Sequence, residues 1–135
     1  MRPASEGPFL LDTSPWLALL EGEAGADEVE RILREERVIL PFLVLLEVYY
    51  VSFREGGEEA ADRRYALMKS LDLELVWEVD EPTLLTAGRF KALYKLSLAD
   101  ALIAAFAKTR KATLVHRNPE YEPLRGEVGQ LVLPS

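Results

Sequence analysis

Three acidic residues that are far apart in the chain each lie in an apolar stretch. Asp12 follows the run 9–11, Glu47 divides a long aliphatic and aromatic segment, and Asp100 opens the run 101–107. A carboxylate that is buried without a partner costs several kcal/mol or loses its charge. The simplest joint use of three such carboxylates is to hold a divalent cation, because hard cations prefer oxygen ligands. The sequence therefore predicts that these side chains meet around a metal ion.

Each carboxylate also has an ordinary structural explanation. Asp is favoured at helix N-caps, so Asp12 suits the start of a helix. Asp100 stands three residues after Ser97, a spacing that resembles a capping box. Glu47 is too far into its helix to cap it, which leaves an exposed stripe or a buried ion pair with an arginine as its alternatives. The functional interpretation thus depends on the three residues together.

Strands and helices alternate along the chain and would position these residues. Short apolar segments at 9–11, 38–40, 73–77, 112–115 and 131–133 are typical of strands. Helical periodicity and capping residues favour helices over residues 15–21, 24–36, 41–54, 58–70, 81–94 and 97–110. We expect either Thr13 or Ser14 to cap the first helix. The alternation predicts an α/β fold with parallel strands and helices on both faces.

Ligands of such sheets bind beyond the carboxyl ends of the strands. Asp12 follows the first predicted strand, and His116, Arg117 and Asn118 follow the fourth. These residues are therefore expected at the same edge of the sheet. His116 is the only histidine, and packing beside the site is its expected role.

Length and composition indicate one domain. The 135 residues suffice for a single core, with a flexible lead expected over residues 1–8 and a domain over 9–135. No apolar run reaches the roughly 18 residues of a membrane span. The chain has no cysteine, which excludes disulfides and thiolate metal sites. We expect a cytoplasmic protein with no membrane partner.

The negative net charge of −7 disfavours a nucleic-acid partner at first sight. The basic residues are concentrated, however: residues 89–117 contain seven Lys and Arg and one acidic residue, Asp100. This segment is either a phosphate-facing surface or a solvated helix face. The candidate contacts to a phosphate backbone are Lys108, Lys111 and Arg117.

Four segments together resemble the PIN domain, and within it the VapC-type toxins of bacterial and archaeal toxin–antitoxin pairs. They are Leu10-Leu11-Asp12-Thr13-Ser14, the segment 41–48 around Glu47, the segment 96–105 around Asp100, and 113–118. The likeness extends from about Phe9 to Leu133, and 96–105 is its most specific part. It implies a three-layer fold with a central parallel sheet of four to five strands flanked by helices.

The resemblance also implies a ribonuclease that depends on Mg²⁺ or Mn²⁺. Asp12 and Asp100 would be the principal metal ligands, Glu47 the third acidic member, and Ser14 a hydroxyl that supports Asp12. Such toxins usually form homodimers and are inhibited by a cognate antitoxin. The expected partners are thus RNA, a second copy of the chain and an antitoxin.

One position departs from the family pattern. The family commonly has an Asp after the fourth strand, where this chain has Asn118, with Glu120 and Glu122 as acidic residues just downstream. Asn118 can still bind a cation through its carbonyl oxygen, but it brings no charge. A PIN-like binding module with a weakened site therefore stays open as the alternative to an enzyme. If RNA binds, Tyr94 and Tyr121 are candidates to stack on unpaired bases.

Overall fold

The computed structural model describes residues 7–134, so most of the lead expected over residues 1–8 lies outside the described part. The strands are β1 (Phe9–Leu11), β2 (Val38–Pro41), β3 (Glu74–Val76), β4 (Thr113–His116) and β5 (Gln130–Val132). The helices are α1 (Thr13–Glu21), α2 (Ala26–Glu35), α3 (Phe42–Ser70), α4 (Glu81–Leu93) and α5 (Leu98–Thr109), with a 3₁₀ helix η1 (Pro119–Leu124). The predicted α/β class is confirmed.

All five strands pair in parallel, in the order β3-β2-β1-β4-β5. The chain builds outward from β1 to β2 and β3, then returns to add β4 and β5 on the other side of β1. The strand order therefore reverses between β1 and β4. In open parallel sheets, this reversal leaves a crevice at the carboxyl ends of the two strands, which is the usual ligand position.

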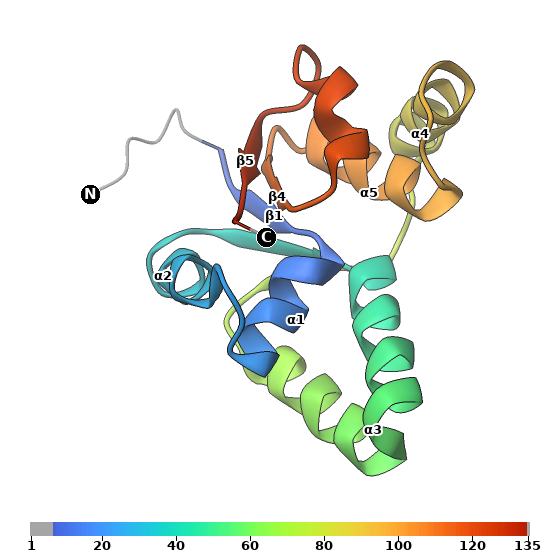
Figure 1. Ribbon diagram of the computed structural model, residues 1–135. Helices are drawn as coiled ribbons and strands as arrows, with labels where there is room; N and C mark the ends of the chain where they lie inside the picture. Colours follow the sequence, from blue (N-terminus) through green and yellow to red (C-terminus); the bar gives the residue numbers. More distant parts are fainter. Residues whose placement is uncertain (1–6, 135) are drawn as a thin grey trace.

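The helices cover the sheet on both faces (Figure 1). Helices α1, α2 and α3 lie on one face, and α4 packs along α5 on the other. The central strands β1 and β2 are buried along their whole length, as expected for strands covered on both sides. This gives the three-layer arrangement that the resemblance implied.

Helix α3 has two arms that meet at Gly57. This residue has φ 87° and ψ 174°, a backbone conformation that side chains with a Cβ rarely adopt. The glycine pair Gly56-Gly57 therefore ends the first arm and turns the chain into the second, as Figure 1 shows. The sequence predicted two helices here, and the kink preserves that division.

Two local features differ from the predictions. Asp12 caps α1, because its side chain accepts the backbone N–H of Thr13; this agrees with the ordinary structural role given for Asp12, and the expectation that Thr13 or Ser14 caps the helix was wrong. The 3₁₀ helix η1 was not predicted, since its six residues carry no helical periodicity and include two prolines, Pro119 and Pro123. Within residues 7–134, no helix is long and apolar enough to cross a membrane.

Candidate active site

The carboxylates singled out in the sequence are carried by elements that end or begin at the carboxyl edge of the sheet. Asp12 follows β1 directly, and Asp100 lies in the first turn of α5, which runs back toward the start of β4. Glu47 is in the second turn of α3, the helix that begins directly after β2. Asn118 follows β4 by two residues. The fold thus brings Asp12, Asp100 and Asn118 to the strand-order reversal, with Glu47 on the β2 side of Asp12.

Asp12 is the buried member of the group. Its side chain is 6% exposed, its backbone N–H donates to the Val115 carbonyl at 3.0 Å, and its Oδ1 accepts the Thr13 N–H at 2.8 Å. Burial raises the pKa of Asp12 to about 7, and the negative charges of Asp100 and Glu47 add to this rise. Without a cation, the site therefore disfavours the charged carboxylate.

Asp100 is held by two neutral donors. The Asn118 side-chain amide donates to Oδ2 at 3.1 Å, and the Tyr121 hydroxyl donates to Oδ1 at 3.1 Å. Tyr121 is completely buried and also lies within hydrogen-bonding reach of Asp12. Its pKa is raised far above the usual range, chiefly by burial, so the hydroxyl keeps its proton and acts as a donor. Tyr121 therefore links the two aspartates.

Glu47 has a different partner. Its Oε1 accepts a hydrogen bond from the Thr13 hydroxyl at 2.6 Å, which joins α3 to the first residue of α1. Glu47 is partly buried, and its charge reaches Asp12. The resemblance implied that the Ser14 hydroxyl supports Asp12, which stays a prediction, and the structure adds the Thr13 hydroxyl as a partner of Glu47. Ser14 contributes its backbone carbonyl, which accepts from Arg117 at 3.5 Å.

His116 and Gln130 hold η1 against the end of β4. The backbone N–H of Asn118 donates to His116 Nδ1 at 3.0 Å, so the ring proton is on Nε2, which donates to Gln130 Oε1 at 2.7 Å. Gln130 in turn donates from Nε2 to the Tyr121 carbonyl at 2.8 Å. Burial lowers the pKa of His116 and keeps it neutral. His116 thus helps to fix the position of η1 beside the site.

The donor set suits a hard divalent cation. Asp12 and Asp100 are near enough for the Asp100 charge to add to the burial that raises the Asp12 pKa, and the Asn118 amide and Tyr121 hydroxyl contact Asp100. Among residues 7–134, no three His, Cys, Asp or Glu side chains are close enough to surround a metal by themselves. Mg²⁺ commonly binds proteins through only one or two carboxylates and keeps several waters. A cation held by Asp12 and Asp100 would also offset the burial and the smaller repulsion that together raise the Asp12 pKa.

Two of the predicted phosphate contacts, Lys108 and Lys111, are not gathered with the carboxylates. Lys108 and Lys111 lie at the other end of α5, before β4 begins, and Lys108 is 3.7 Å from Glu127 Oε1. The Arg117 guanidinium pairs with Glu23 at 3.4 Å and donates to the Ala24 carbonyl. Arg117 therefore ties β4 to the turn between α1 and α2.

The residues around η1 also differ from expectation. Glu120 and Glu122 are exposed, and Glu122 pairs with Arg125. Tyr121 cannot stack on a base in this arrangement because it is fully buried, and the Tyr94 hydroxyl donates to Glu127 at 2.8 Å. Sequence reasoning missed Thr13 and Tyr121 as partners of the carboxylates. The only sign of these contacts in the sequence was that Thr13 follows Asp12 and that Tyr121 lies three residues after Asn118.

Solved structures with the same fold span nearly the whole chain. VapBC2 of Rickettsia felis, solved bound to a promoter DNA fragment, is similar with TM-score 0.77 and 17% identity over 93% of this chain and 98% of that one. VapC20 of Mycobacterium tuberculosis, described as a sarcin-ricin loop cleaving toxin, gives 0.72 and 21% over 93% and 99%. VapBC-1 of nontypeable Haemophilus influenzae gives 0.72 and 19% over 92% and 96%. At such identities the likeness establishes the fold.

No curated protein matches the sequence. A family model does: the PIN domain model matches residues 9–126, which include β1 to β4, all five α-helices and η1. The match contains Asp12, Glu47, Asp100 and Asn118, and it agrees with the sheet order and with the solved structures. The chain belongs to the PIN domain family.

Proposed function

We propose that this protein is a metal-dependent endoribonuclease, the toxin of a toxin–antitoxin pair. The observation that carries the proposal is the meeting of Asp12 and Asp100 at the carboxyl edge between β1 and β4, where the Tyr121 hydroxyl links them. Membership of the PIN family and the similarity to VapC20 support the reaction class. Asp12 is buried and the Asp100 charge opposes its ionisation, so a divalent cation between the two would stabilise both carboxylates.

In this proposal, Asp12 and Asp100 hold Mg²⁺ or Mn²⁺ through their carboxylate oxygens. The cation, when bound, supplies an activated water and neutralises charge on the reacting phosphate. Glu47, whose carboxylate the Thr13 hydroxyl orients, would be the third acidic member of the site. Asn118 and Tyr121 hold the Asp100 carboxylate in one orientation. His116 stays neutral and structural, because both ring nitrogens are already bonded.

A positively charged side chain in the loop before α5 is better placed to contact RNA than the lysines at the far end of that helix. Lys95 is exposed and lies two residues before the helix cap Ser97. We propose that Lys95 contacts the phosphate backbone near the site, a contact that positions RNA without reading its sequence. Lys108, Lys111 and Arg117 remain candidates for contacts to more distant phosphates.

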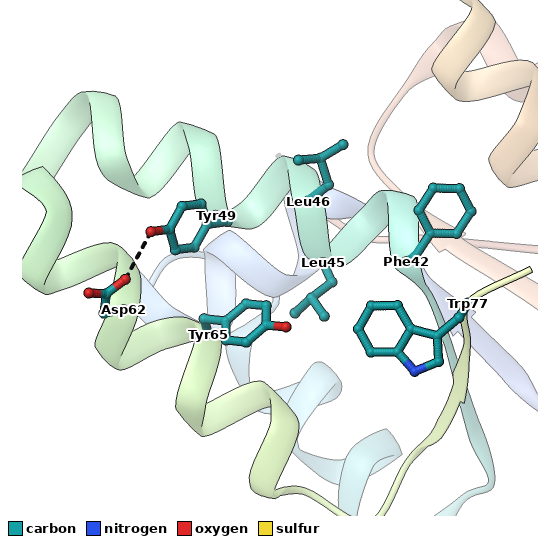
Figure 2. A pocket seen from close by; sticks show the side chains of 7 residues that line it. All are labelled: Phe42, Leu45, Leu46, Tyr49, Asp62, Tyr65 and Trp77. Atoms are coloured by element: carbon teal, nitrogen blue, oxygen red, sulfur yellow. Dashed lines mark hydrogen bonds between the residues drawn. The ribbon is translucent and has the colours of Figure 1, made fainter.

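An antitoxin is the proposed protein partner. Similar structures include toxin–antitoxin complexes, and this chain has an apolar pocket of about 530 Å³ to receive a partner segment. Figure 2 shows it between the two arms of α3 and the segment after β3. Its lining is Phe42, Leu45, Leu46, Tyr49, Asp62, Tyr65 and Trp77. Leu46 and Trp77 are 51% and 53% exposed and belong to one apolar lining, and contiguous exposed apolar patches of this kind mark interaction sites.

A homodimer is also proposed, on the basis of the resemblance. Sedimentation of the purified protein tests it, with the double variant Leu46→Asp/Trp77→Ala as a check on the pocket. If the pocket receives an antitoxin, this variant keeps its oligomeric state and loses the antitoxin. If the pocket is instead the self-association surface, the variant becomes monomeric.

The alternative, a binding module with a weakened site, is favoured by one observation. Both neighbours of Asp100 at η1 are neutral donors, Asn118 and Tyr121, so η1 adds no negative charge to the site. Incubation of structured RNA with the protein in Mn²⁺ and in EDTA separates the two functions. The enzyme cleaves only in Mn²⁺, and Asp100→Asn abolishes cleavage. A binding module retains RNA in both buffers and leaves it intact.

A further inference from the structure

The Tyr121 hydroxyl is a fixed part of the carboxylate site. Tyr121 has no exposed surface, and its hydroxyl lies 3.1 Å from Asp100 Oδ1. A buried tyrosine hydroxyl needs a partner, and this one reaches the pair of carboxylates at the strand-order reversal. The tyrosine was not among the residues that the sequence marked as ligands.

Three contacts hold Tyr121 in place, one on its ring, one on its backbone and one on η1. The His116 ring packs against it with centroids 4.7 Å apart, and Gln130 Nε2 donates to its backbone carbonyl at 2.8 Å. Asn118 caps η1 by accepting the Glu120 N–H at 3.0 Å. These contacts fix the position of the hydroxyl, which therefore does not move as the end of a flexible surface side chain would.

Together, Tyr121 and Asn118 bind both oxygens of Asp100. One donor on each oxygen restricts rotation of the carboxylate about its Cβ–Cγ bond. The Asn118 orientation is defined by the same network, because its Oδ1 accepts from Glu120 while its Nδ2 faces Asp100 Oδ2. Groups that orient a ligand in this way typically change metal affinity by 10- to 100-fold when they are removed.

We propose that Tyr121 is a positioning residue of the cation site, which with Asn118 holds the Asp100 carboxylate in the orientation that binds the cation beside Asp12. This rests on the proposed function, because it assumes that the two aspartates bind a divalent cation. It adds a residue of η1 to the groups that hold the cation site in place. The hydroxyl donates to Asp100 and is not itself a ligand.

The test compares two Tyr→Phe variants that each lose one hydroxyl–carboxylate bond. Tyr121→Phe removes the bond to Asp100, and Tyr94→Phe removes a bond of 2.8 Å to Glu127 on the α4 side, outside the site. Titration of MnCl₂ into each protein by calorimetry measures the affinity. We expect Tyr121→Phe to bind Mn²⁺ about 10-fold more weakly, and Tyr94→Phe to match the wild type within about twofold.

A second readout separates positioning from a general loss of stability. The RNA cleavage rate of Tyr121→Phe should fall at limiting Mn²⁺ and recover at saturating Mn²⁺, with the KM for RNA unchanged. A merely structural bond would lower the amount of active protein at every Mn²⁺ concentration. Unchanged or tighter Mn²⁺ binding by Tyr121→Phe overturns the proposal.

Two further outcomes are distinguishable. If the wild type binds no Mn²⁺, the proposed function and this inference both fall; if it binds Mn²⁺ and cleaves RNA while Tyr121→Phe behaves identically, only this inference falls. Should Tyr121→Phe not fold, Asn118→Ser tests the same fixation from the other oxygen of Asp100. Serine keeps a capping oxygen for η1 and removes the amide donor, so unchanged Mn²⁺ affinity in that variant also overturns the proposal.

Discussion

The side-chain amide of Asn118 donates to Oδ2 of Asp100 at 3.1 Å, so a neutral group faces the carboxylate where PIN-like sequences commonly have an aspartate. With an asparagine in place of the aspartate, the site carries one negative charge fewer than in that pattern. The bond also connects η1 to the first turn of α5.

Asn118→Asp should therefore destabilise the metal-free protein. The change would place two carboxylates in contact, and like charges at this distance disfavour ionisation of both. We expect a lower Tm than wild type in EDTA and a larger rise in Tm when Mn²⁺ is added, because the cation binds the folded state only. Differential scanning fluorimetry in the two buffers measures this. A variant as stable as the wild type in EDTA would show that the two side chains do not interact as the structure indicates.

The hydroxyl of Thr13 should matter through Glu47. Thr13→Val keeps the shape of the side chain and removes the 2.6 Å bond to Glu47 Oε1, whereas Thr13→Ser keeps the hydroxyl. We expect kcat for RNA cleavage to fall about 10-fold in the valine variant, with a smaller change in the serine variant. Steady-state kinetics at saturating Mn²⁺ provides the comparison. Equal rates for Val and Ser would contradict a role for this bond in orienting Glu47.

The pH dependence of stability should carry the signature of Asp12. The pKa of Asp12 is about 7 in the folded protein, against an ordinary value of 3.8. The folded state therefore holds an extra proton between these values, so its stability declines as pH rises through this window. The slope is at most about 1.4 kcal/mol per pH unit.

Urea unfolding in EDTA at several pH values between 4 and 8 measures this effect, with Asp12→Asn as the reference. The unfolding free energy of the wild type, relative to that of Asp12→Asn, should fall as the pH increases. Saturating Mn²⁺ should remove the trend. A difference that does not vary with pH would mean that Asp12 ionises normally in the fold.

The basic residues can be ranked by their place relative to the carboxylates. Lys95→Ala should raise the KM for RNA several-fold at low salt, because the loss of a phosphate contact weakens binding. The double variant Lys108→Ala/Lys111→Ala should change KM less, since both lysines lie at the opposite end of α5 from Asp100. Cleavage kinetics at two salt concentrations checks the order. A larger effect in the double variant would place the RNA across the far edge of the sheet.

Sequence periodicity predicted the framework well because local rules govern it. The strand ends predicted at residues 11 and 115, against 11 and 116 in the structure, placed Asp12 and Asn118 at one edge, and Ser97 caps α5 as its spacing indicates. The Gly56-Gly57 pair similarly divided α3. These features follow from hydrophobic patterns, capping and glycine conformation, all of which are read from neighbouring residues.

The partners of the carboxylates could not be predicted in the same way. Thr13 and Glu47 are 34 positions apart, and Arg117 pairs with Glu23 across 94 positions. Such hydrogen bonds depend on how the layers pack, which no local pattern encodes. The 3₁₀ helix that buries Tyr121 is also too short to show periodicity. Tertiary geometry thus decided which groups touch Asp100.

The central claim is that Asp12 and Asp100 jointly bind a divalent cation. Calorimetric titration of Mn²⁺ into wild type, Asp12→Asn and Asp100→Asn tests it most directly, with circular dichroism to verify that each protein is folded. The account predicts saturable binding by the wild type that is lost, or weakened by more than about 10-fold, in both variants. Equal Mn²⁺ binding by wild type and either asparagine variant, or no binding by the wild type, would contradict it.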